Sequence, residues 1–240
     1  MIKQKYIFDD REYSVFHSDS NNISEILGLC IAEGFEPLSM PQLADLMINN
    51  PNCSAFWEMA ISTTSIIANG KTKAGNEVIA IAHCPSYLSS PKNLYHAIRE
   101  NQVSHGAVCI PDEEFWKILE LEDNVNVFVV DRALVEQWPK EFYGVDAPLV
   151  KEKIAGLDAI AINHPLTAPY FASRERAEKF LKKHRDICSG NIEINTIPLW
   201  ADKPLASLII SFYVGINNYS QGPGPSALYS KIGTAIGRKP

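Results

Sequence analysis

Several features that mark common protein classes are scarce in this chain of 240 residues. The most apolar stretch, 205–216, is interrupted by serine and glycine, and it is shorter than the ~20 residues that a membrane span needs. No segment rich in Pro, Gly and Ser divides the chain internally. We therefore expect a single globular domain over residues 1–240 and no membrane span, with a loop-rich C-terminal tail over about 217–240.

An excess of basic residues is also missing. The chain has 22 Lys and Arg against 28 Asp and Glu, which gives a net charge of -6 and a pI of about 5.5. Proteins that bind nucleic acids or anionic membranes usually present a basic face, so the sequence predicts neither as a partner. The first residues lack the apolar core and cleavage site of a secretory signal. These observations favour a cytoplasmic protein.

Paired cysteine motifs are absent as well. The sequence contains no CxxC, and its five cysteines are odd in number and widely spaced. Reduced thiols in a cytoplasm fit this pattern better than a disulfide framework does. They are Cys30, Cys53, Cys84, Cys109 and Cys188.

The common cofactor and catalytic motifs are missing too. GxGxxG, HExxH and GxSxG do not occur. The segment 70–72 reads GKT, but the glycine that a phosphate-binding loop needs five positions earlier is Ser65. No histidine has another histidine two or four positions away, as a local metal site would. The sequence therefore predicts no cofactor and no metal.

Clear signals for helices and strands remain. Helix starts are predicted near Asn22, Ser39, Ser90, Asp112 and Ser173, and a short helix is predicted over 132–138. Strands are predicted over 6–8, 13–17, 61–68, 77–82, 125–130, 157–162, 192–196 and 205–216. The first two strands form one predicted hairpin and the next two a longer one. The order indicates an α/β or α+β domain with a mixed β-sheet flanked by helices on both faces.

Four side chains follow predicted apolar strands directly: His83, Cys84, Asp131 and His164. If strands 78–82, 125–130 and 157–162 run in one direction, their ends meet in one crevice, where open α/β sheets bind ligands. Adjacent residues on a strand point to opposite faces, so His105 or His164 is a better partner for the Cys84 thiol than His83 is. The alternative is that Cys84 is an inert core residue.

Two functional hypotheses follow from these residues. The first is an enzyme acting on a small molecule, a hydrolase or group transferase, with Cys84, His164, Asp131 and His83 as its catalytic candidates. The second is a non-catalytic ligand-binding domain or a homo-oligomeric assembly domain. The groups at the three strand ends can carry protons, which favours the enzyme.

The cysteine pattern generates a direct test. We expect alkylation of the denatured chain without reductant to add a label to every cysteine, because an odd, unpaired set predicts free thiols. Mass spectrometry of the alkylated protein measures the number of labels. Three labels or fewer would reveal a disulfide and contradict the expected compartment.

Overall fold

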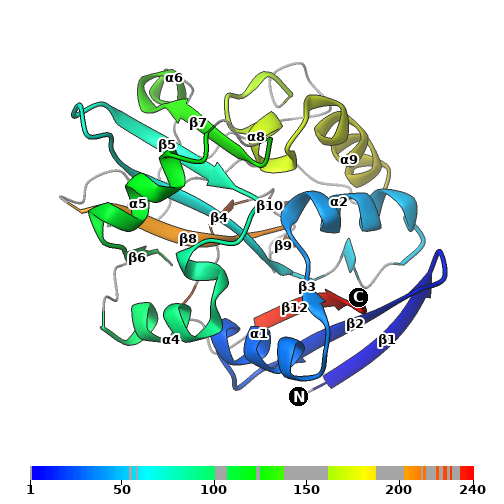
Figure 1. The fold of residues 1–240 in the computed structure, drawn as a ribbon. Coiled ribbons are helices and arrows are strands. Elements are labelled where there is room, and N and C mark those ends of the chain that lie inside the picture. Colours follow the sequence, from blue (N-terminus) through cyan, green and yellow to red (C-terminus); the bar gives the residue numbers. More distant parts are fainter. Residues whose placement is uncertain are drawn as a thin grey trace.

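The computed structural model describes residues 2–53, 56–57, 59–100, 107–122, 125–137, 162–187, 203–211, 213–214, 220–221, 224–225, 228 and 233–240. Helices lie on both sides of a mixed β-sheet (Figure 1). This arrangement confirms the predicted α/β fold class. No helix in these ranges is long and apolar enough to cross a membrane.

The first helices begin and end where the local sequence predicts. Helix α1 (Ile23–Ala32) is capped by the Asn22 side chain, which accepts hydrogen bonds from the next turn, and it is followed by Gly34 at φ 77°. Helix α2 (Met40–Asn49) begins after Ser39, whose backbone N–H donates to the Gln42 side chain at 2.9 Å. These contacts satisfy backbone groups that helix ends leave without partners.

The remaining described helices are α4 (Pro91–Glu100), α5 (Asp112–Leu119), α6 (Arg132–Glu136), α8 (Thr167–Phe171) and α9 (Arg174–Ile187), with a short 3₁₀ helix η1 (Tyr87–Ser89). Four of them, α4, α5, α6 and α9, follow the predicted starts, whereas η1 and α8 do not. Helix α9 agrees with the start predicted near Ser173. Helix α8 was not predicted.

Strands β1 (Ile2–Phe8) and β2 (Arg11–Ser18) form the first predicted hairpin. Its two turn residues, Asp9 and Asp10, have φ values of 49° and 59°. Positive φ at both positions matches a type I′ turn, whose twist suits the twist of the strands. The second predicted hairpin is also present, as β4 (Ser62–Lys71) and β5 (Glu77–Ala82).

The main sheet has the order β1-β2-β12-β4-β5-β7. Strand β12 (Gly233–Arg238) lies between β2 and β4, antiparallel to β2 and parallel to β4. Strand β8 (Leu205–Ile210) pairs with β4, and β7 (Val127–Asp131) pairs antiparallel with β5. Three short strands pair with these longer ones. Strand β3 (Glu36–Pro37) pairs with β12, and both β6 (Val108–Cys109) and β11 (Gly224–Pro225) pair with β8.

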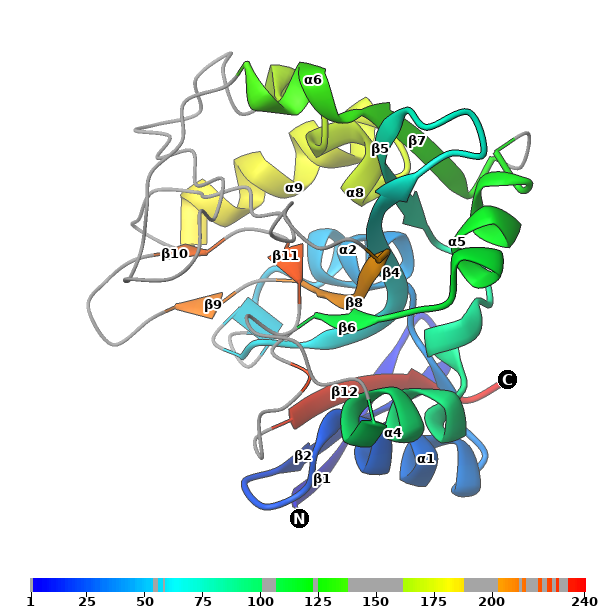
Figure 2. The same ribbon diagram turned by 90° about the vertical axis from the view of Figure 1, so that its left-hand side faces the viewer.

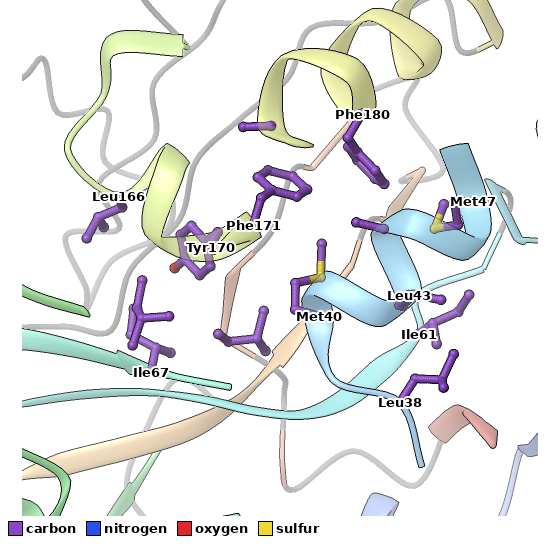
Figure 3. Close-up of a cluster of buried hydrophobic side chains, with 14 of the residues drawn as sticks. Leu38, Met40, Leu43, Met47, Ile61, Ile67, Leu166, Tyr170, Phe171 and Phe180 are labelled. Atoms are coloured by element: carbon purple, nitrogen blue, oxygen red, sulfur yellow. The ribbon is translucent and has the colours of Figure 1, made fainter. Parts of the chain in front are cut away.

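Each face of the sheet carries its own hydrophobic core. On one face, strand residues such as Ile67, Ile79 and Ile81 pack with α2, α8 and α9, as Figure 3 shows for part of this cluster. On the other, Ile66 and Ala80 pack with α1, α4 and α5. The alternation along β4 and β5 is the two-residue period of a strand buried on both sides.

The predicted strands agree with the structure only in part. The predicted strands 78–82 and 125–130 lie in one sheet as β5 and β7. The predicted strand 157–162 lies outside the described residues except for Ile162, which is helical, and 192–196 lies wholly outside them. Within the segment expected to be rich in loops, 233–238 form strand β12 in the middle of the sheet.

The packing of β12 on α1 predicts the effect of enlarging a glycine. A Cβ atom at Gly237 would clash with Cys30 Sγ and would lie 2.7 Å from Phe35 Cβ. We expect Gly237→Ala to lower the free energy of unfolding by about 1–3 kcal/mol, because this core has no room for the methyl group. Urea denaturation measures the loss.

Gly28→Ala is the matched control, since its Cβ would meet Pro91 Cβ at an ordinary 3.7 Å within helix α1. This control should be neutral or stabilising by up to ~1 kcal/mol. Equal stability of Gly237→Ala and the wild type would show that β12 is not packed as described.

Candidate functional site

His83 follows β5 and joins the sheet to two helices. Its Nδ1 lies 2.8 Å from Ser65 Oγ on β4, and its Nε2 lies 2.7 Å from the Pro169 carbonyl oxygen in α8. The Met40 N–H at the start of α2 donates to the same Ser65 Oγ at 2.8 Å. One serine and one imidazole therefore connect β4, β5, α2 and α8.

These partners fix the proton positions. A carbonyl oxygen only accepts, so His83 Nε2 carries the proton, and Nδ1 accepts from the Ser65 hydroxyl. Burial lowers the pKa of His83 to about 4, against an opposing effect of the Pro169 hydrogen bond. The imidazole is therefore neutral near pH 7, and both of its nitrogens are occupied by protein groups.

Cys84 lies on the opposite face of the sheet. It is half-buried and packs against the core that contains α1, α4 and α5, whereas His83 faces α8. Burial raises the pKa of the Cys84 thiol, which disfavours the nucleophilic thiolate. His83 and Cys84 therefore point apart, as alternation along a strand requires.

Asp131 lies at the other end of β5 from Cys84. Strands β5 and β7 are antiparallel, and Asp131 is paired with Val78. Val78 and His83 are five positions apart, which is about 17 Å along a strand. The Asp131 carboxylate is exposed and caps α6, where Oδ1 accepts from the Ala133 N–H at 2.8 Å.

His164 is buried just before α8, and its Nδ1 accepts from the Leu166 N–H at 3.2 Å. Burial lowers its pKa to about 4. His164 and His83 thus both support α8, while Cys84 and Asp131 lie elsewhere, and His105 lies outside the described residues. The four predicted residues do not share one crevice, because the strands that precede His83 and Asp131 run in opposite directions.

Ser65 is the important partner that the sequence analysis missed. It is fully buried, and its hydroxyl already bonds to His83 and Met40. A serine beside a histidine resembles the pair used for nucleophilic catalysis, but here no substrate could reach Oγ. The sequence signal for Ser65 is that a polar residue occupies a core-facing position of a buried strand. Its hydrogen bonds with His83 and Met40 therefore have a structural role.

A second region lies where the chain leaves β8 (Figure 2). Strands β9 (Tyr213–Val214) and β10 (Ser220–Gln221) form a separate antiparallel pair. Strand β11 then returns to β8, with Gly224 opposite Ile210, before the chain enters β12. The described residues contain no group of three or more His, Cys, Asp or Glu side chains placed to hold a metal ion.

Neither a protein-family model nor a curated protein sequence matches the chain. A solved structure does. It comes from work on the accommodation of massive sequence variation in Nanoarchaeota by the C-type lectin fold. The similarity has a TM-score of 0.74 and 27% sequence identity, and it covers 98% of this chain and 98% of that one. Likeness of this extent shows that the two chains share a fold.

The hypothesis of a hydrolase or group transferase is wrong. The structural neighbour has a lectin-type fold, which supports the non-catalytic alternative instead. The antiparallel β5 and β7 explain the error in physical terms, because they place two of the expected catalytic groups at opposite strand ends. His83 remains important as a structural group.

The buried histidines predict a pH dependence of stability. His83 has a pKa of about 4 in the folded chain against an ordinary value of 6.5, so its contribution is complete above pH 6.5 and is lost as the pH falls towards 4. At ~1.4 kcal/mol per pKa unit, His83 should account for up to about 2 kcal/mol of lost stability between pH 7 and pH 5. Urea denaturation at the two pH values measures this loss.

His164 and His184 act in the same direction, because burial also lowers each of their pKa values to about 4. The variant His83→Gln isolates the first contribution, since glutamine does not titrate. Its stability should fall less than that of the wild type over the same pH range. A variant with an unchanged pH dependence would refute the role assigned to His83.

Proposed function

We propose that this chain is a non-catalytic ligand-binding protein that uses a C-type lectin fold as its scaffold. The supporting observation is the similarity, over 98% of both chains, to a structure in which this fold accommodates massive sequence variation. Core residues must be kept for stability, whereas surface residues determine what a protein binds. Extensive variation on a constant fold is therefore a property expected of a binding scaffold.

The chain between β8 and β12 is the best placed binding surface. Both of its ends are held by the main sheet, since β8 pairs with β4 and β12 pairs with β2. Strand β11 adds a third attachment through its pairing with β8. Leu228 of this segment packs in one of the cores, so we propose that the variable positions lie on either side of it.

The sequence of this segment supports the same proposal. Between Lys203 and Lys231 it contains no Asp, Glu, Lys, Arg or His, and residues 213–230 are rich in Tyr, Asn, Ser and Gly. These residue types dominate the binding loops of antibodies, because tyrosine supplies rigid contact area and the small polar residues supply adaptable hydrogen bonds. The ligand we propose is accordingly a protein surface that is recognised without ion pairs.

A displayed library tests this proposal. Positions 217–219 and 229–230 are randomised, and the library is selected on purified lysozyme as the protein probe. We expect folded binders whose thermal midpoints stay close to that of the parent chain, because the randomised positions lie between the sheet attachments. Their affinity should change little with NaCl concentration, since screening weakens only interactions between charges.

Reversion of a selected binder to the parent residues at these positions is the control and should abolish binding. Two outcomes would reject the proposal. In one, most randomised chains fail to fold, which would make the segment part of the core. In the other, selected binding survives reversion, which would place the binding surface elsewhere on the molecule.

A further inference from the structure

Strand β1 forms one edge of the main sheet. Within the described residues it pairs with β2 alone, along all seven of its positions, and Figure 1 shows it at the periphery of the fold. An edge strand of this length presents a row of N–H and C=O groups to any strand that can approach. The question is whether its backbone and side chains suit a particular partner.

The hydrogen bonds of the neighbouring strand show which backbone groups of β1 point outward. The Lys239 N–H donates to the Glu12 carbonyl oxygen at 2.8 Å, so Glu12 directs its backbone away from β1. Ile7 is opposite Glu12, and this pair is therefore not hydrogen-bonded. By alternation, the N–H and C=O groups of Lys3, Lys5 and Ile7 face the open edge.

The charges that normally protect such an edge are already paired within the chain. The Lys3 ammonium contacts the Glu33 carboxylate and lies over the Phe16 ring, and Lys5 Nζ is 2.8 Å from Glu12 Oε1. Ile7, in contrast, is 75% exposed. The edge therefore combines lysines that each contact a carboxylate of their own chain with an uncovered apolar side chain.

We propose that β1 pairs antiparallel with β1 of a second copy of this chain, with the two-fold axis at Tyr6. In this register Lys5 forms hydrogen-bonded pairs with the partner's Ile7 and Ile7 with the partner's Lys5. Tyr6 faces the partner's Tyr6 in the closer, non-hydrogen-bonded geometry that favours aromatic contact. Lys3 comes opposite the exposed carboxylate of the partner's Asp9, which adds an attraction of opposite charges at each end.

Other registers of the same pair are less favourable. An axis at Lys5 places the two Lys5 side chains opposite each other, and an axis at Gln4 places Lys3 opposite Lys5, so both bring like charges together. An axis at Ile7 shortens the overlap, because the turn at Asp9 begins two residues later. Odd shifts would put outward-facing groups opposite inward-facing ones. Charge and hydrogen bonding together select the axis at Tyr6.

This interface goes beyond the proposed ligand binding and does not depend on it. The interface uses β1, whereas the proposed binding surface lies between β8 and β12 in the sequence. A dimer would carry two copies of the ligand-binding surface. Two linked surfaces raise the avidity for a ligand that presents repeated sites.

Sedimentation velocity over a range of protein concentrations tests the interface. We expect the wild type to form a dimer whose fraction rises with concentration. Lys5→Pro should be monomeric, because proline removes an N–H that faces the open edge and leaves the β1–β2 hydrogen bonds in place. Lys5→Ala keeps that N–H and should still dimerise, which separates the backbone effect from loss of the Lys5 side chain.

Ile7→Lys provides a second variant with an intact backbone, and it should weaken the dimer by placing an ammonium opposite the partner's Lys5. Circular dichroism confirms that each variant is folded. A wild type that stays monomeric at every concentration would overturn the proposal. A folded Lys5→Pro variant that associates as strongly as the wild type would also overturn it. If Lys5→Pro does not fold, the same result for a folded Ile7→Lys variant would do so.

Discussion

The insertion of β12 between β2 and β4 is the constraint on which the rest of the fold depends. Strand β12 pairs with β2 over six positions, from Gly233 opposite Ser18 to Arg238 opposite Tyr13, and it meets β4 at Ala235 and Ser62. Because β2 lies near the start of the sequence and β12 near its end, this pairing joins distant parts of the chain. In the described part of the sheet, the first hairpin reaches β4 through β12.

The same closure holds the two ends of the surface that we propose for binding. The two cores are built from strand residues of alternating faces and from the helices that cover each face. On one face, the His83 and Ser65 hydrogen bonds hold α2 and α8 to the sheet. The chain between β8 and β12 starts and ends on this frame, which is why we propose it as the binding surface.

The sequence predicted the elements that depend on local signals. Asn22 and Ser39 predict helix starts, because residues of these types cap helices. Asp9 and Asp10 predict a hairpin turn, because aspartate tolerates positive φ. Continuous apolar runs predicted β5 and β7 as strands of one sheet. Their relative direction could not be predicted, because it depends on how the intervening chain connects the two strands and not on the residues of either strand.

Strand β12 was missed for a packing reason. Gly233 and Gly237 normally argue against a strand, but here they allow Ile26, Cys30 and Phe35 to approach the sheet closely. The contact of Ser65 with His83 was not predicted because it joins residues that are distant in sequence, and the other partner of His83 lies in α8, a helix that the sequence did not predict. The four residues predicted as a catalytic cluster are not brought together for a different reason, because that prediction assumed a common strand direction.

Native-state hydrogen exchange of the free chain tests the central role of β12 most directly. If β12 closes the fold, the buried amides of β2, β12 and β4 should exchange only through global unfolding and with one common opening free energy. That value should match the free energy of unfolding from urea denaturation. Amides of β12 that exchange with a clearly lower opening free energy than those of β4 would contradict it, because the C-terminal strand would then be a peripheral addition to the sheet.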